Sequence, residues 1–436
     1  MRNSAGRSGS VPLEMIPDSA ADVGAKVTGA ASASHRLAHQ LTETVNGFTE
    51  WLARYGSVSW DHQSFYAGPL GGRAKSLYYR KPLLGILAVS PMVFCEAFVP
   101  TARKVFHRPM RFPIADAHYA MGFALLASTP GDSQHHTAVR YLQHLVKSRC
   151  AGFSEHCWGY PFDWVTRNGT IRAETPLITT TPYVYEAFLQ VFKLDGNERW
   201  RAVLHSIVKH AMQDIGDVPT SPTASSCTYM PNSGSGVVNA SAYRAFLLTS
   251  AHHELGCAEA ASKAERNLNF VLESQQANGS WYYAMDGERH FVDHFHTCFV
   301  LKALAKIQSL NPSAACMRAI ERGVEYYSSQ LLDEHGLPKP FAKAPRLTVY
   351  RRELYDYAEC VNLCVLLRDS FPVLRRTLTT VLTDLLDRWI KADGSFRSRE
   401  LTLGWDNVPM HRWAQAQMFR SVALFLSKER ISSSTQ

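Results

Sequence analysis

The stretch AASKAERNLNFVLESQQANGSWYYAMDGERHFVDHFHTCFVLKALAKI, residues 260–307, holds one complete unit of the pattern that decides the fold. In 260–275, apolar residues recur at three- and four-residue spacing with charged residues between them, which predicts an amphipathic helix. A polar turn with Gly279 follows, and glycine in this place is a usual signal for the end of a helix. The second expected helix, 292–307, is apolar on almost every side and carries its polar residues in the first turn.

The same unit recurs along the chain. Turns with glycine at 152, 216, 279, 336 and 394 follow one another at intervals of 64, 63, 57 and 58 residues. A repeat near 60 residues, with one amphipathic and one apolar helix, predicts an inner ring of buried helices covered by an outer ring. The expected fold is an all-α (α/α)6 toroid, because open α-solenoids have shorter periods of about 33–47 residues. The apolar helices are expected at 114–128, 178–192, 237–251, 292–307, 354–367 and 411–426, and their amphipathic partners at 36–54, 135–149, 199–214, 260–275, 313–331 and 373–391.

The segments outside the repeat set the expected domain boundaries. Residues 1–34 have no apolar core of a secretory signal and predict a flexible leader. One toroid domain is expected over 35–430, with 56–112 as an insertion or an extra helical pair and 431–436 as a tail. The run from Pro82 to Val99 is apolar, but a proline and a glutamate interrupt it, so we expect a buried helix with a break and no membrane span.

Composition excludes several classes of protein. Of the 436 residues, 46% are hydrophobic and 19% charged, which is enough for a large core. The nine cysteines are scattered without a CxxC pair, which argues against structural zinc and favours a reduced, cytoplasmic setting. The net charge of +8 comes without a nucleic-acid-binding module, so nucleic acid is not an expected partner. No phosphate-binding loop, nucleophile elbow or zinc-protease motif occurs, and neither a cofactor nor a metal is expected.

The turn Gln275-x-x-x-Gly279-Ser280-Trp281, with its echo KADGSFRS at 391–398, resembles the glycine–aromatic turn between hairpins of α/α-toroid proteins. That superfamily includes six-hairpin glycosidases, polysaccharide lyases, uronate epimerases, terpenoid cyclases and prenyltransferase β subunits. The chain lacks the D-x-D-D motif of the cyclases and the Asp, Cys and His that hold zinc in the prenyltransferases. With CWGYPFDW and the NGSW…DHFHT block, it looks most like toroid proteins of bacterial exopolysaccharide and capsule clusters, which implies carbohydrate chemistry.

Chemistry is expected at the mouth of the toroid, where loops lead into the inner helices and helix dipoles favour anions. Asp293, His294 and His296 open the fourth apolar helix, and an i, i+3 relation places Asp293 and His296 on one face. A carboxylate beside an imidazole can tune a general acid or base. The alternative interpretation is that Asp293 only caps the helix and His296 is a satisfied, buried histidine.

A second cluster, residues 155–164, surrounds a carboxylate with aromatic rings, as many sugar sites do, although a packed aromatic plug is the alternative. The catalytic candidates are Asp163, Asp293 and His296. The candidates for substrate binding lie in the mouth loops and turns: Trp158, Tyr160, Trp164, Trp281, His294, Arg351, Arg352, Tyr355, Asp356, Trp405, Asp406, His411 and Arg412.

Two chemistries on a glycan fit these residues. Hydrolysis would use Asp163 and Asp293 as paired carboxylates, about 5–5.5 Å apart for retention or 6.5–9.5 Å for inversion. Elimination or C5 epimerisation of a uronate would use His296 or Tyr160 as base and an arginine for the sugar carboxylate, and loop arginines favour such an anionic glycan. The alternative classes are a terpenoid cyclase or prenyltransferase-like enzyme and a non-catalytic glycan-binding assembly subunit.

Overall fold

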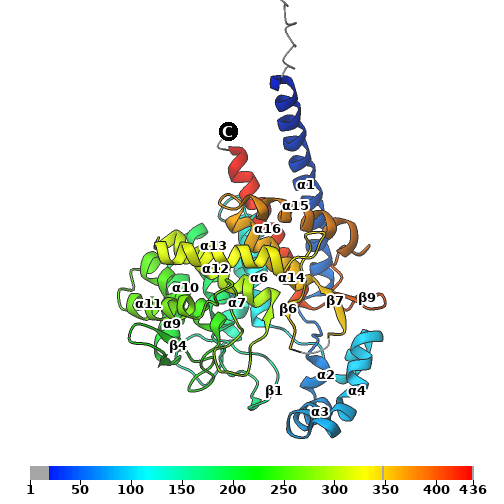
Figure 1. The fold of residues 1–436 in the computed structure, drawn as a ribbon, viewed down its shortest axis with the longest axis vertical. Helices are drawn as coiled ribbons and strands as arrows, with labels where there is room; N and C mark the ends of the chain where they lie inside the picture. Colours follow the sequence, from blue (N-terminus) through cyan, green and yellow to red (C-terminus); the bar gives the residue numbers. More distant parts are fainter. Residues whose placement is uncertain (1–18, 346–347, 435–436) are drawn as a thin grey trace, which may run out of the picture.

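Six nearly all-apolar helices form an inner ring in the computed structural model, which describes residues 19–345 and 348–434 (Figure 1). Each helix packs against the next, and the last returns to the first, so that the ring is closed. The predicted (α/α)6 toroid is thereby confirmed. The inner helices are α6 (Pro113–Leu126), α8 (Thr181–Asp195), α10 (Val238–Leu255), α12 (His294–Leu310), α14 (Leu354–Leu367) and α16 (Ala416–Ser434).

Small residues let the inner helices approach closely where the ring closes. A Cβ atom on Gly122 of α6 would lie 2.5 Å from a ring carbon of Phe419 on α16. Every side chain from Val238 to Ala251 of α10 is buried, which explains why the inner helices lack an amphipathic pattern. The apolar faces of both rings merge into one hydrophobic core.

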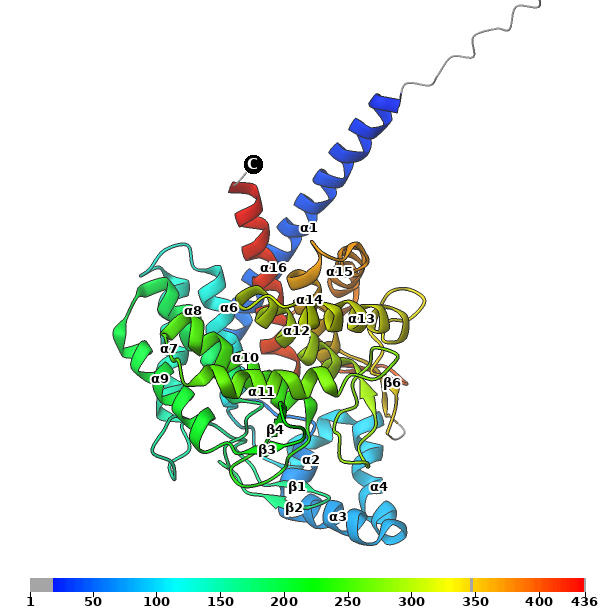
Figure 2. The same cartoon turned by 60° about the vertical axis from the view of Figure 1, so that its left-hand side comes forward.

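Six amphipathic helices cover the inner ring on the outside. The first helix, α1, covers the last inner helix, α16, so the two ends of the chain complete one hairpin (Figures 1 and 2). Helix α1 begins at Ser19, ahead of the expected start at 36, and the part of the expected leader before Ser19 lies outside the described residues. The outer helices are α1 (Ser19–Tyr55), α7 (Ser133–Lys147), α9 (Glu198–Gln213), α11 (Ala260–Glu273), α13 (Ala314–Gln330) and α15 (Pro372–Asp384), followed by a π-helical turn at Leu385–Trp389.

Short antiparallel strands shape the loops that lead into the inner helices. Two hairpins are formed by β1 with β2 and by β3 with β4, β5 pairs with β6, and β7, β8 and β9 form a three-stranded sheet. A π-helical turn, His411–Gln415, then leads into α16. The strands are β1 (Trp164–Thr166), β2 (Gly169–Ile171), β3 (Asp217–Pro219), β4 (Ser225–Cys227), β5 (Val292–Asp293), β6 (Phe341–Lys343), β7 (Tyr350–Glu353), β8 (Arg399–Leu401) and β9 (Trp405–Asp406).

The segment 56–112 is a helical insertion on the side of the toroid where α16 begins, opposite the C-terminal end (Figures 1 and 2). The expectation that the run Pro82–Val99 is a buried helix was wrong, because Leu83 and Leu87 of α4 are 84% and 72% exposed. No helix among the described residues is long and apolar enough to cross a membrane. The insertion contains α2 (Ser64–Ala67), α3 (Pro69–Arg80), α4 (Pro82–Phe98), a 3-10 turn (Pro100–Ala102) and α5 (Arg103–Phe106).

Candidate functional site

A carboxylate–imidazole pair stands at the start of α12. Nδ1 of His296 lies 2.6 Å from Oδ2 of Asp293, and the other carboxylate oxygen accepts a hydrogen bond from the backbone N–H of His296. Asp293 is almost fully buried, whereas the His296 side chain is 22% exposed. Asp293 therefore both caps the helix and holds the imidazole in one orientation.

Aromatic rings surround this pair. The ring centroids of Tyr283 and Phe295 lie 4.6 Å and 4.4 Å from that of His296, and Phe299 meets it edge-on at 5.6 Å. Among the described residues, Nε2 of His296 has no hydrogen-bond partner. The imidazole thus presents a free nitrogen next to aromatic rings, and aromatic rings are common in sugar sites.

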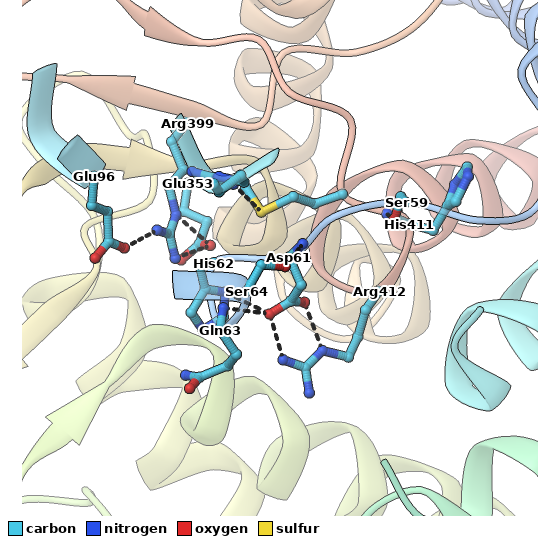
Figure 3. Close-up of polar contacts among 12 residues, drawn as sticks. Ser59, Asp61, His62, Gln63, Ser64, Glu96, Glu353, Arg399, His411 and Arg412 are labelled. Atoms are coloured by element: carbon cyan, nitrogen blue, oxygen red, sulfur yellow. Dashed lines mark hydrogen bonds and ion pairs between the residues drawn. The ribbon is translucent and has the colours of Figure 1, made fainter. Parts of the chain in front are cut away.

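A second charged pair, Asp61 and Arg412, joins the insertion to the turn that leads into α16 (Figure 3). Nε and Nη2 of Arg412 each lie 2.8 Å from one oxygen of Asp61, and both side chains are buried. The guanidinium also lies over the rings of Tyr160 and Trp413, each 4.5 Å away. Burial alone would raise the pKa of Asp61, but Arg412 and the neighbouring hydrogen bonds outweigh it and lower the pKa to about 2.

His62, next to Asp61, is the second imidazole of the mouth. Its ring centroid lies 5.3 Å from that of Trp413, which in turn lies 6.2 Å from Phe295. Burial and the nearby arginines lower the pKa of His62 well below its ordinary value, although Asp61 opposes them. His62 is therefore neutral at neutral pH.

Charged side chains also line the interior of the ring below the aromatic layer. Lys302 pairs with Glu359, and Glu186 pairs with Lys306 and lies 3.9 Å from Arg420. Each of the two clusters brings opposite charges together from different inner helices, so each carboxylate faces at least one cation.

The structure brings five predicted residues to the mouth. Asp293 and His296 form the pair described above, and Arg412 lies over Tyr160. Tyr355 meets Trp413 edge-on at 4.7 Å and Phe295 at 5.1 Å. These residues come from three inner-helix starts and one loop.

Several predicted residues lie within the protein instead. The indole N–H groups of Trp158 and Trp281 donate to backbone carbonyls of outer helices, Leu145 and Val271, so both rings are part of the core. His411 is fully buried, with its ring nitrogens at 2.5 Å from the Tyr119 hydroxyl and 3.0 Å from the Gly56 carbonyl oxygen.

Three further predicted residues, His294, Asp356 and Asp406, face the outer helices or the insertion. His294 is buried, with Nε2 2.9 Å from the Tyr327 hydroxyl and Nδ1 3.5 Å from Asp356. Burial raises the pKa of Asp356 to about 7, against the lowering by His294. Asp406 pairs with the buried Arg103 of the insertion.

The remaining predicted residues lie on the loops around the mouth. Asp163 accepts hydrogen bonds from Arg172 and from the backbone of Ala173, and no contact joins it to Asp293 in the described part of the chain. Trp164 meets Tyr160 edge-on. The other three are tied to the β7–β9 sheet: Arg352 pairs with Asp333 and Glu400, Arg351 is exposed on β7, and Trp405 packs on Trp389.

Sequence reasoning missed Asp61 and His62. Both belong to the insertion, where no repeat or motif points to the mouth. The buried charges Glu186 and Lys302 were also missed, and charged residues inside otherwise apolar helices were the signal that could have found them. No group of three His, Cys, Asp or Glu residues among those described could hold a metal ion.

No protein-family model matches the chain, and no curated protein matches it in sequence. Solved structures do share its fold. The chain is similar to a cellobiose 2-epimerase from Bacillus thermoamylovorans, with 7% identity and a TM-score of 0.58 over 73% of this chain and 88% of that one. It is similar to a D-mannose isomerase, with 12% identity and a TM-score of 0.55 over the same shares. A GH76 alpha-mannanase from Bacteroides thetaiotaomicron matches with 7% identity and a TM-score of 0.54, over 74% of this chain and 88% of that chain.

The chain therefore has the α/α-toroid fold found in these sugar epimerases, isomerases and mannanases. At 7–12% identity the likeness establishes the fold, and the chemistry has to be argued from the site.

Proposed function

We propose that this protein is an enzyme that moves a proton on a neutral sugar, next to its carbonyl carbon, and so catalyses epimerisation or isomerisation. The observation that carries the proposal is the pair His296–Asp293, with its free Nε2 beside aromatic rings at the mouth. An imidazole fixed by a carboxylate is suited to take up and return a proton near neutral pH.

In this proposal the open-chain sugar packs on the rings of Phe295 and Tyr283. Nε2 of His296 takes the proton from C2, and the electrons of the C–H bond form the C1–C2 double bond of an enediolate, with the negative charge on O1. Transfer of the O2 proton to O1, with return of a proton from His296 to C1, gives the ketose. Delivery of a solvent proton to the opposite face of C2, with the carbonyl re-formed at C1 and the His296 proton released to solvent, gives the epimer. The carboxylate of Asp293 stabilises the imidazolium that forms between the two steps.

The carboxylates of the mouth favour this chemistry over hydrolysis, which needs two carboxyl groups facing one glycosidic bond. Asp61 is bound by Arg412, Asp293 by His296, and Asp163 by Arg172. None of these three carboxyl groups is paired with another.

The arginines favour a neutral sugar over a uronate. Arg412 and Arg352 are each held by acidic side chains of the protein itself, and Arg172 is held by Asp163. Their charge is therefore largely compensated before any substrate arrives. The resemblance to toroid proteins of bacterial exopolysaccharide clusters supports a place for the activity in the metabolism of such glycans.

The test is proton exchange with solvent. The purified chain is incubated with D-mannose and with cellobiose in D₂O, and products are examined by NMR. We expect a new epimer or ketose that carries deuterium at C1 or C2, because the imidazolium exchanges its proton with solvent. We expect His296→Gln to lower turnover about 10²–10⁴-fold. His335→Gln is the matched control, because the side chain of His335 is 71% exposed on an outer turn.

Two results would overturn the proposal. One is an unchanged sugar with no deuterium at carbon. The other is release of new reducing ends from a mannan without deuterium, which would assign the mouth to hydrolysis.

A further inference from the structure

The insertion carries an exposed apolar face that the proposed chemistry does not use. On α4 the side chains of Leu83, Leu87 and Phe94 are 84%, 72% and 58% exposed. Leu84, Ile86 and Phe98 are also at least half exposed. A surface helix of a globular protein normally turns such residues inward, and a contiguous exposed apolar patch marks an interaction site.

The exposed orientation of α4 is built into its packing. Gly85 fits against the backbone of α3, where a Cβ atom would lie 2.0 Å from Cα of Tyr78, and Met92, two turns further on, is buried. Near its end, Glu96 is 2.8 Å from Arg399, which also pairs with the buried Glu353 (Figure 3). These contacts hold one face of α4 against the protein and leave the apolar face outside.

The charge of the molecule is concentrated around this face. Residues 64–111 contain eight Lys and Arg and a single acidic residue, a formal charge of +7, whereas the rest of the chain holds 38 basic and 37 acidic residues. The one acid, Glu96, is already bound by Arg399. The exposed basic residues are Arg73, Arg80, Lys81, Lys104 and Arg108, and among the described residues none of them forms an ion pair.

We infer that the α3–α4 hairpin docks the protein onto an anionic lipid surface. An apolar helix face with basic residues at its edges is the combination that binds the interface of a bilayer with anionic lipids. Helix α4 has 17 residues and lies on the membrane rather than across it. A second copy of the chain is a poorer occupant, because the exposed, unpaired basic residues of the two copies would repel each other.

The position of the hairpin gives the docking a direction. The insertion lies on the mouth side of the toroid, and the free end of α1 projects from the opposite side (Figure 2). A protein docked through α4 would hold its mouth close to the lipid headgroups.

The test is flotation of the full chain with vesicles of phosphatidylcholine alone and of phosphatidylcholine mixed with phosphatidylglycerol. We expect binding to the mixed vesicles only, weakened by salt. We expect at least about a tenfold loss for the double variant Leu87→Asp, Phe94→Asp, and about fivefold for each of Arg80→Gln and Lys81→Gln. Leu403→Asp is the matched control, because Leu403 is 71% exposed on another loop, and it should leave binding unchanged.

All substituted side chains are exposed, so the variants are expected to fold, and circular dichroism checks this. The inference is overturned if the chain floats with neither vesicle, or if the double variant binds as well as the unchanged chain. It is also overturned if the chain binds no vesicle but forms a dimer in sedimentation that the double variant abolishes, since the occupant would then be a second copy.

Discussion

Asp61 and Arg412, 351 positions apart in the chain, form a bidentate ion pair that joins the insertion to the start of the last inner helix. Both side chains are buried, and the exposed fraction of each is at most 2%. A buried pair of this kind is costly to break, because removal of one partner leaves the other charge without compensation. The pair therefore couples the position of the insertion to the geometry of the mouth.

We predict that Asp61→Ala lowers the free energy of unfolding by about 3–5 kcal/mol. The double variant Asp61→Leu, Arg412→Met should recover most of this loss, because apolar side chains of similar volume avoid the buried, unpaired guanidinium. Urea denaturation of the three proteins measures the effect. A double variant as unstable as Asp61→Ala would show that the pair does not act through its buried charge.

Asp116 gives a prediction on pH. Burial raises its pKa to about 7, although Arg111, 2.7 Å away, lowers it. In the unfolded chain the pKa is about 3.9. The folded protein thus keeps a proton that the unfolded chain releases, so the stabilisation is complete below about pH 4 and is lost as the pH rises through about 7.

The variant Asp116→Asn should remove this contribution. Its stability relative to the unchanged protein should increase steadily from about pH 4 to about pH 7 and then level off. Buried histidines make stability depend on pH in the opposite direction; burial lowers the pKa of His411, for example, to about 3. Their contribution is the same in both proteins, so it cancels when the two curves are compared. Urea denaturation of both proteins between about pH 4 and pH 7 tests the prediction. A stability difference that does not change with pH would show that the pKa of Asp116 is not raised by folding.

The toroid could be predicted because the burial of each helix determines the spacing of its apolar residues in the sequence. Inner helices such as α10 are surrounded on all sides and read as almost continuously apolar, and the turn at Gly279 recurs because each hairpin needs the same C-terminal end. The pair Asp293–His296 could also be predicted, because both residues lie on one helix turn.

The rest of the mouth depends on contacts between distant loops. Nothing in the segment around Asp61 indicates that Arg412 lies against it. The sequence does not show which aromatic residues belong to the core and which belong to the mouth. Trp158 and Trp281 donate to outer-helix carbonyls and lie in the core, whereas Tyr160 packs against the Arg412 guanidinium at the mouth. The expectation for α4 was wrong because an apolar helix has the same composition whether it lies in a core or is exposed at the surface, as α4 is.

The turn at Gly279 gives a prediction on folding stability. Its φ angle is +88°, and a Cβ atom would lie 2.3 Å from the carbonyl oxygen of Arg322. The equivalent Gly336, with φ +76°, has no neighbour closer than 3.9 Å. Gly336→Ala should lower the free energy of unfolding by about 1–2 kcal/mol, because alanine is strained in the left-handed region. Gly279→Ala should lower it by about 1–3 kcal/mol more than Gly336→Ala does, because of the clash with Arg322. Thermal unfolding compares the two, and equal losses would show that the backbone at Arg322 can yield.

The last prediction separates the two roles of Asp293 and rests on the proposed function. Serine at a helix start accepts the same backbone hydrogen bond as aspartate, but it carries no charge to hold the His296 imidazole. Asp293→Ser should therefore keep the stability of the protein to within about 0.5 kcal/mol and lower turnover about 10²-fold or more. Asp293→Ala should lower turnover equally and also lose about 1 kcal/mol of stability, because the cap is gone.

Turnover with D-mannose and cellobiose, together with urea denaturation, distinguishes the outcomes. If Asp293→Ser and Asp293→Ala differ in activity in proportion to their stability, Asp293 acts only as a cap. If both lose activity equally while only Asp293→Ala loses stability, the carboxylate acts on the imidazole. In that case kcat should fall with little change in KM, because Asp293 is buried behind His296 and supports the imidazolium that forms only during the reaction.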